Sequence, residues 1–230
     1  MHFSIPHALH RLGKQICFFA VFVCDTILPH KHDVRQLSAM SAERALATLP
    51  RCKDQKVPAI FEYRDRRVKR LIWELKYRGN RNIARLIADV LCIHIYSMRR
   101  SKTLPEKTIL MPIPLSRARR RERGFNQNEL VIQEMVRDVE ERGAPWCRLD
   151  IEFNALERVR HTAPQSSLAR RAERLENLRG CFAVLRPELV RDKDIILLDD
   201  VVTTGSTLRE ARAVLLQAGA RSVHCIAIAH

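Results

Sequence analysis

Apolar residues recur along the chain with two different spacings. Short continuous or alternating apolar runs predict strands at residues 57–63, 109–114, 151–157, 194–198 and 223–229. Apolar residues at helical spacing predict helices at residues 41–47, 68–75, 82–98, 126–139 and 208–218. In the last third of the chain, strand, turn, helix and strand follow one another as a βαβ unit. We therefore expect an α/β fold, with a parallel sheet flanked by helices on both faces.

The two ends of the chain differ in regularity. Residues 1–57 contain one short apolar run and one short helix that Ser41 would cap, whereas residues 58–230 carry the repeated strand and helix patterns. We predict a divergent N-terminal segment followed by one domain over 58–230. The apolar run at 16–24 is far shorter than the roughly 20 residues that cross a bilayer. Because no small-residue cleavage site follows it, we expect a cytoplasmic protein without a membrane span.

Charge and cysteine usage narrow the classes of partner. The chain has 41 Lys and Arg against 26 Asp and Glu, a net charge of +15 that attracts phosphorylated small molecules, nucleic acid or an anionic membrane surface.

The seven cysteines form no CxxC pair, which indicates reduced thiols. Cys181 and Cys225 lie in apolar stretches and are expected in the core. Cys17, Cys24 and Cys52 lack the paired spacing of zinc sites, so we expect no zinc.

A polar run directly follows the strand predicted at 194–198. It begins with Asp199 and Asp200 and continues with Val202, Thr203, Thr204, Gly205, Ser206 and Thr207. Ligands of open parallel sheets bind beyond the carboxyl ends of the strands. Hydroxyls, a glycine and the N–H groups of a starting helix hold a phosphate, and carboxylates accept hydrogen bonds from sugar hydroxyls. We predict that the two acids bind a ribose diol and that the following residues bind its phosphate.

Two arginine-rich segments flank this predicted site in the sequence. Residues 116–124 contain five arginines and are predicted to be a basic loop, while residues 158–180 contain six arginines, few strong apolar positions and a turn, as a mobile loop would. The basic loop is interpreted either as a solvated loop that contacts pyrophosphate or as a contact with nucleic acid.

The polar run resembles the phosphoribosyl-pyrophosphate signature of type I phosphoribosyltransferases: an apolar strand, two acids, two apolar residues and then Thr-Thr-Gly-Ser-Thr. Over residues 59–230 the chain is also similar to the ComF family, which is called amidophosphoribosyltransferase-like or GntX-like. The similarity is carried by residues 75–80, 112–119, 123–127, 158–166 and 177–182.

The resemblance implies a type I phosphoribosyltransferase-like sheet with a flexible hood over the active site. It implies that Asp199 and Asp200 are catalytic and hold groups linked to Mg²⁺, and that residues 202–207 bind phosphoribosyl pyrophosphate. It further implies a pyrophosphate loop at Leu115, Ser116 and Arg117. The hood residues that it implies are Arg160, Thr162 and Gln165.

The activity implied is transfer of a pentosyl group from phosphoribosyl pyrophosphate to an unidentified acceptor, as in nucleoside metabolism. In purine-salvage enzymes of this fold an acid stands at the position of Thr203, so salvage of hypoxanthine or guanine is disfavoured. The alternative is an accessory protein of competence and DNA uptake that binds single-stranded DNA and uses its pocket, with phosphoribosyl pyrophosphate or ribose 5-phosphate, for regulation. The resemblance also implies a homodimer.

Overall fold

The computed structural model describes residues 31–54, 58–142, 149–159 and 180–230. Residues 1–36 form one unit and residues 37–230 form a second, compact unit. The helices are α2 (Lys31–Ser38), α3 (Ala42–Thr48), α4 (Arg66–Trp73), the π-helix η1 (Glu74–Arg78), α5 (Arg81–Arg100), α6 (Arg117–Arg123), α7 (Gln127–Arg142), the 3-10 helix η3 (Pro187–Leu189) and α9 (Ser206–Gln217). The strands are β1 (Ala59–Phe61), β2 (Thr108–Pro112), β3 (Asp150–Ile151), β4 (Leu156–Arg158), β5 (Phe182–Val184), β6 (Asp194–Val201) and β7 (Ser222–Ala229).

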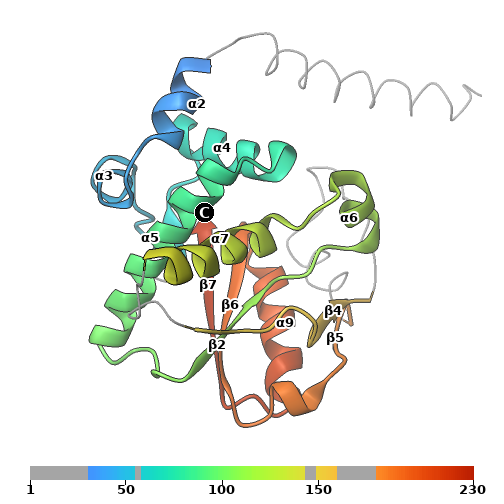
Figure 1. Ribbon diagram of the computed structural model, residues 1–230. Coiled ribbons are helices and arrows are strands. Elements are labelled where there is room, and N and C mark those ends of the chain that lie inside the picture. Colours follow the sequence, from blue (N-terminus) through green and yellow to red (C-terminus); the bar gives the residue numbers. More distant parts are fainter. Residues whose placement is uncertain (1–30, 55–57, 143–148, 160–179) are drawn as a thin grey trace, which may run out of the picture. The chain divides into compact units, whose positions relative to one another are not determined.

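A five-stranded sheet with the order β1-β7-β6-β2-β3 forms the centre of the compact unit (Figure 1). Every neighbouring pair in it is parallel, and β4 and β5 form a separate antiparallel pair. The expected α/β class with a parallel sheet flanked by helices is therefore confirmed. In the described ranges, no helix is both long enough and apolar enough to cross a membrane.

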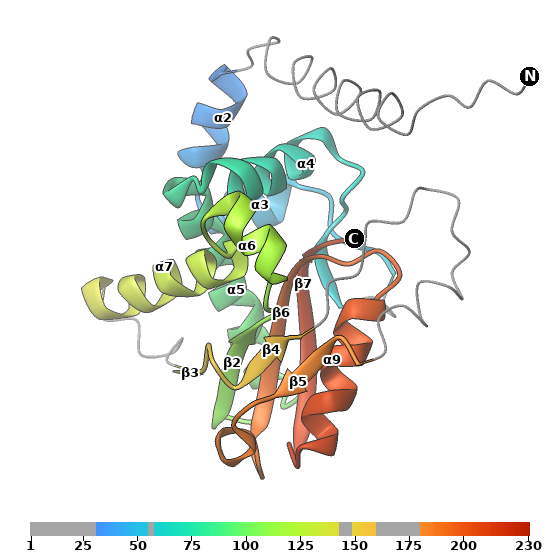
Figure 2. The ribbon, with the colours of Figure 1, turned by 90° about the vertical axis from the view of Figure 1, so that its right-hand side faces the viewer.

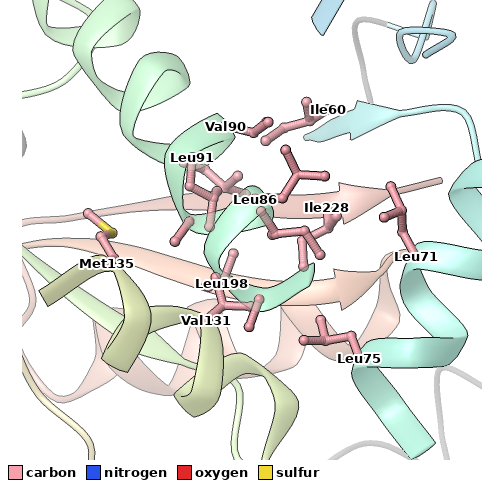
Figure 3. Packing of buried hydrophobic residues seen from close by; sticks show 14 of the residues in the cluster. Ile60, Leu71, Leu75, Leu86, Val90, Leu91, Val131, Met135, Leu198 and Ile228 are labelled. Atoms are coloured by element: carbon pink, nitrogen blue, oxygen red, sulfur yellow. The ribbon is translucent and has the colours of Figure 1, made fainter. Parts of the chain in front are cut away.

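Strand β6 shows why both faces of the sheet are covered. Its Ile196 and Leu198 belong to one buried cluster, whereas Ile195 and Leu197 belong to another. Successive side chains of a strand point to opposite faces, so a strand that is buried on both sides is apolar at every position. Figure 3 shows the first cluster, in which β6 and β7 meet residues of β1, α4, η1, α5 and α7.

The second cluster joins the opposite face of the sheet to α9 and to the β4–β5 pair. Leu208, Ala211 and Leu215 of α9 are buried in it, one helical turn apart. Figure 2 shows α9 and the β4–β5 pair on this side of the sheet. The two layers of helices leave the carboxyl ends of β6 and β2 at one edge, where the candidate site lies.

Helix α3 precedes the domain predicted to begin at residue 58. Ser41 accepts the N–H of Arg44 and caps α3 as expected, and Ala42 and Ala45 are buried in the same cluster as the sheet residues. The division of the chain between residues 57 and 58 stays a prediction.

The single strand predicted at 151–157 is wrong. Asp150 and Ile151 join the parallel sheet beside β2, and Leu156 begins β4, which pairs with β5. Between them the Glu152 side chain accepts the N–H of Asn154, which bends the chain away from the sheet. A local side-chain hydrogen bond of this kind competes with strand pairing.

The segment predicted to be a basic loop at 116–124 is largely a helix, α6. Ser116 caps its start, because its Oγ accepts the N–H of Arg119 at 3.4 Å, and Gly124 ends it with a φ of 79°. Arginine is a good helix former. Helix α6 buries none of its residues, so it has no apolar stripe from which hydrophobic spacing could predict a helix.

Candidate functional site

The acidic pair lies within strand β6 rather than beyond its end. The expected end of the strand at Leu198 is too early, because Asp199 and Val201 still pair with Ala227 and Ala229 of β7. Side chains alternate along a strand, so the two acids point to opposite faces of the sheet. They therefore have different surroundings, although they are neighbours in the sequence.

The carboxylate of Asp200 is buried and held on both oxygens. The Nζ of Lys76 lies 2.9 Å from Oδ1, and the side-chain amide of Gln127 donates a hydrogen bond to Oδ2. Asp200 is 5% exposed, which makes such pairing necessary for an ionised side chain. Lys76 comes from η1 and Gln127 is the first residue of α7. We call this arrangement of Lys76, Gln127 and Asp200 the Asp200 clamp.

Two contacts bring η1 and the start of α7 together at the clamp. Gly79 ends η1 with a φ of 55°, and a Cβ built on it would lie 3.2 Å from the ring of Phe125. The guanidinium of Arg123 lies 5.3 Å above the ring of Tyr77 and donates to Oε1 of Gln127 at 2.9 Å. The segments 75–80 and 123–127, which carry part of the family resemblance, thus meet at Asp200.

Asp199 is only partly buried, and its chemistry differs from that of its neighbour. Its Oδ1 accepts the N–H of Asp200 at 2.9 Å. Loss of solvent, followed by the negative charge of Asp200, raises the pKa of Asp199 to about 7, although the hydrogen bond from Asp200, the Lys76 ammonium and the Asn128 amide oppose this. Asp199 is thus partly protonated at neutral pH.

The predicted phosphate segment forms a tight turn into α9. Gly205 has a φ of 71°, and α9 begins at Ser206, two residues earlier than expected, so Thr207 lies in its first turn. The hydroxyls of Thr204 and Ser206 are 2.8 Å apart, and Arg209 donates to Oγ of Ser206 at 3.2 Å. Hydroxyls, the N–H groups of a helix start and a guanidinium gather here, and the Ser206 N–H donates to Oγ1 of Thr204 at 3.4 Å. We call residues 203–207 the phosphate cradle, after the role predicted for them.

Residues 123–230 match the family described as phosphoribosyl transferase domain. This match and the relatives that follow confirm the predicted resemblance to a phosphoribosyltransferase domain and to the ComF family. The DNA utilization protein YhgH of Escherichia coli O157:H7 is 33% identical over 153 residues, 66% of this chain and 63% of that protein. Competence protein F of Haemophilus influenzae is 31% identical over 155 residues with the same coverage. Competence protein ComFC of Bacillus subtilis is 32% identical over 162 residues, 70% of this chain and 58% of that protein.

The chain thus matches about 63% of the length of the YhgH and competence protein F relatives. Among solved structures, a hypoxanthine phosphoribosyltransferase from Staphylococcus aureus is similar over 62% of each chain, with 12% identity and a TM-score of 0.36.

The predicted pyrophosphate loop follows β2, the strand beside β6. Ile113 donates its N–H to the carbonyl of Leu198, so the chain after β2 leaves the sheet at the same edge as the acidic pair. Ser116 is buried and caps α6, and exposed Arg117 pairs with Glu157 of β4 at 3.1 Å. Leu115 lies between β2 and this cap and is partly buried. The predicted hood residues Arg160, Thr162 and Gln165 lie outside the described residues.

Hydrophobic spacing and motif matching assigned no role to several residues of the site. Lys76 and Gln127 lie within segments that resemble the family, yet no pattern in the sequence relates either one to Asp200. Arg158 of β4 is a further example, because its guanidinium and the Asp199 carboxyl interact electrostatically; burial lowers the pKa of Arg158 and the Asp199 charge opposes this. In the sequence, Arg158 is marked only by its position at the start of 158–166, one of the segments that carry the family resemblance.

Proposed function

We propose that this protein binds phosphoribosyl pyrophosphate together with Mg²⁺ and transfers the phosphoribosyl group to an acceptor. One observation supports this most directly: the partly exposed Asp199 and the phosphate cradle adjoin each other at the carboxyl end of β6. A ribose 5-phosphate has hydroxyls and a phosphate about one sugar ring apart. Asp199 accepts hydrogen bonds from the ribose hydroxyls and the cradle holds the 5-phosphate.

The residues at the site fit a magnesium ion that arrives with its ligand. Mg²⁺ typically uses one or two carboxylates, several waters and phosphate oxygens. Asp199 keeps an exposed part for such a contact, whereas both oxygens of Asp200 are occupied in the clamp. No group of three acidic, histidine or cysteine side chains in the described ranges is placed to hold a metal by itself. Bound there, the ion would neutralise the pyrophosphate leaving group.

The protein's own residues would orient the sugar and stabilise the leaving charge. The cradle fixes the 5-phosphate, which places C1 of the ribose relative to the acidic pair and reduces the entropy cost of the reaction. Arg117, at the edge of the predicted pyrophosphate loop, is exposed, and beside its pair with Glu157 its guanidinium keeps further N–H donors for the departing pyrophosphate. Lys76 and Gln127 keep Asp200 in place throughout.

Calorimetry with the purified full chain tests the proposal. Phosphoribosyl pyrophosphate and ribose 5-phosphate are titrated with and without Mg²⁺ into the parent protein, Asp199→Asn and Thr204→Val, with Glu188→Gln as a control because Glu188 is exposed and distant in sequence from the cradle. We expect saturable binding, Mg²⁺-dependent for the pyrophosphate ligand, that weakens at least about tenfold in the two site variants, since charged hydrogen bonds contribute about 1.5–3 kcal/mol. Unchanged affinity in Asp199→Asn would contradict the site.

A second candidate function, binding of single-stranded nucleic acid, is supported by one surface. The guanidinium groups of Arg70 and Arg78, which both pair with Glu74, lie 4.8 Å and 5.0 Å from the ring centre of Trp73, and Tyr77 is 46% exposed beneath Arg123. Rings interleaved with arginines stack bases and contact phosphates. We call Arg70, Trp73, Tyr77, Arg78 and Arg123 the arginine–aromatic surface. The curated relatives named for DNA utilization and competence agree with such a role.

Helix α6 adds free positive charge next to this surface. Arg119 and Arg121 are exposed, and among the described residues neither side chain makes a hydrogen bond or ion pair. Replacing both by glutamine should weaken binding of a fluorescent single-stranded oligonucleotide and reduce its salt dependence, while Arg100→Gln with Lys107→Gln controls for net charge. If binding is equally salt-dependent in both double variants, this surface does not bind the oligonucleotide. The expected cytoplasmic location and the homodimer remain predictions.

A further inference from the structure

The first two residues of α7 carry side-chain amides, and each amide lies near one acid of β6. Gln127 donates its amide to Asp200 in the clamp. Loss of solvent and the charge of Asp200 raise the pKa of Asp199 to about 7, and the amide of Asn128 is one of the groups that oppose this rise. Asn128 therefore lies close enough to Asp199 to stabilise its ionised form. The two neighbouring amides thus correspond to the two neighbouring acids.

The side chain of Asn128 is fully enclosed, yet it is unpaired. Asn128 is 0% exposed, and neither its amide nitrogen nor its amide oxygen has a hydrogen-bond partner among the described residues, Asp199 included. Its backbone is anchored, because its N–H donates to Oδ1 of Asn126 at 3.0 Å and Nδ2 of Asn126 donates to the carbonyl of Ile113 at 3.1 Å. The start of α7 therefore holds an unpaired amide at a fixed place beside Asp199.

An unpaired amide at this position lowers the stability of the free protein. Its polar atoms have left water without gaining a hydrogen bond, whereas an apolar side chain of similar size is stabilised by burial. The residues that follow in α7 are apolar and packed, since Leu130 and Val131 belong to the first buried cluster. Packing alone therefore favours an apolar residue at 128, and the asparagine requires an explanation in the chemistry of the site.

The hydrogen-bonding capacity of Asp199 supplies that explanation. An ionised carboxylate has about four lone-pair positions. Oδ1 of Asp199 already accepts the N–H of Asp200 at 2.9 Å. A hydrogen bond from Nδ2 of Asn128 would occupy a second position and leave two, one for each hydroxyl of a ribose diol. Two donors fixed in the protein would also define the plane of the carboxylate, so that the free lone pairs keep fixed directions.

We propose that Asn128 is a positioning residue that makes the site selective for a ribose with both of its hydroxyls. When the sugar phosphate binds, the Asn128 amide donates to Asp199 and fixes its carboxylate, which accepts the 2- and 3-hydroxyls. Because this hydrogen bond forms in the complex, the cost of the unpaired amide in the free protein is relieved on binding and adds to the affinity for ribose. The inference rests on the proposed binding of a phosphoribosyl group and names the residue that selects it.

Calorimetry with the purified full chain at a fixed Mg²⁺ concentration tests the proposal with three ligands. Ribose 5-phosphate has both hydroxyls, and 2-deoxyribose 5-phosphate lacks one of them. Inorganic phosphate reports on the phosphate cradle, whose residues line a cavity of about 660 Å³. The parent protein should bind ribose 5-phosphate at least about tenfold more tightly than the deoxy sugar, because the deoxy sugar lacks one hydrogen bond to a charged group.

The variants at position 128 should change this preference and leave the cradle intact. Asn128→Leu should reduce the preference for ribose to less than about threefold, and Asn128→Ser, which keeps a donor, should restore part of it. The affinity for inorganic phosphate should stay within about twofold of the parent value, since Asn128 acts on the diol alone. Gln133→Leu is the matched control, because Gln133 is an exposed amide on the same helix.

Thermal unfolding of the variants distinguishes a positioning role from a structural one. Asn128→Leu removes an unpaired amide and should raise the Tm by about 2–4 °C. Asn126→Leu removes an amide whose nitrogen and oxygen are both hydrogen-bonded, and it should lower the Tm. Opposite shifts at two buried asparagines of one helix start are expected only if the Asn128 amide is unpaired in the free protein.

The outcomes separate this inference from the proposed function. If neither sugar phosphate binds the parent protein, the proposed function fails. If both bind with equal affinity, or if Asn128→Leu keeps the preference for ribose, Asn128 does not select the diol and the inference is wrong. An equal loss of affinity for all three ligands in Asn128→Leu, or a Tm as low as that of Asn126→Leu, would make Asn128 a structural residue and overturn the inference as well.

Discussion

Replacing Lys76 by methionine tests the Asp200 clamp most directly. The Lys76 Nζ lies 2.9 Å from Oδ1 of Asp200, and the two side chains are 21% and 7% exposed. Methionine keeps most of the length and apolar stem of lysine but removes the ammonium. Asp200 is then left with the amide of Gln127 as its only clamp partner, in a position from which water is largely excluded.

The expected loss follows from how well water can replace the ammonium. Removing one partner of a fully buried ion pair costs about 3–5 kcal/mol, whereas exposed pairs contribute about 0–1 kcal/mol. Lys76 lies between these limits, so we expect the free energy of unfolding to fall by roughly 2 kcal/mol. For a chain of this size that corresponds to a decrease in Tm of about 4–8 °C.

Urea unfolding of Lys76→Met, Asp200→Asn and the double variant measures the coupling between the two side chains. Once Asp200 is neutral, loss of the ammonium should cost little, so the double variant should be more stable than additivity predicts by about 1–2 kcal/mol. Lys69→Met is the control, because Lys69 is exposed on α4 and its replacement should change stability by less than about 0.5 kcal/mol. Strict additivity, or a loss in Lys76→Met no larger than in Lys69→Met, would refute the clamp.

Three further predictions concern the site and its supports. The pKa of Asp199 is raised from an ordinary 3.8 to about 7, so the folded protein binds a proton at this carboxyl more tightly than the unfolded chain does. The free energy of unfolding therefore falls as the pH rises from about 4 to about 7. Asp199→Asn should therefore gain stability over the parent, on the order of 1 kcal/mol at pH 8 and less at pH 5 in urea unfolding; an equal gain at both pH values would contradict this. In thermal unfolding, Gly79→Ala should lower the Tm more than Gly124→Ala, because both glycines have positive φ but only a Cβ at Gly79 would meet Phe125. Equal decreases in Tm would mean that the Phe125 ring moves aside. Cys225 should react with iodoacetamide at pH 7.5 on the order of 100-fold more slowly than N-acetylcysteine, because its pKa is raised to about 11; a comparable rate would show an accessible, ionised thiol.

The difference between the predicted and observed ends of β6 has a physical cause. The apolar run at 194–198 predicted a strand correctly, because a central strand is buried on both faces. The strand continues through Asp199, Asp200 and Val201 because β7 offers backbone partners as far as Ala229. Pairing with a neighbouring strand overrides the local preference of aspartate for turns, and a single sequence does not contain that neighbour's register.

The clamp residues illustrate a second limit of sequence reasoning. Gln127 lies 73 residues before Asp200, and Lys76 lies in a helical segment where a lysine ordinarily faces solvent. The π-helix η1 changes the direction of the side chains after Trp73, and hydrophobic spacing at 68–75 contains no sign of that change. The family resemblance marked both segments as related to one function, but only the fold relates them to one carboxylate.

The alternation of side chains in β6 divides the work of the acidic pair. The two aspartates have the same chemistry and adjacent positions, so the sequence assigns them one shared role. In the structure Asp200 is enclosed by Lys76 and Gln127, while Asp199 remains partly exposed with a pKa of about 7. A carboxylate that already has a cation and an amide has little to offer a ligand, whereas Asp199 still has hydrogen-bonding capacity. We therefore expect Asp199→Asn to weaken the binding of ribose 5-phosphate without loss of stability. Asp200→Asn should instead change stability and the position of Asp199, and should affect the sugar only indirectly. Measuring affinity and unfolding on the same two variants distinguishes these roles, because a shared role would move both quantities in parallel.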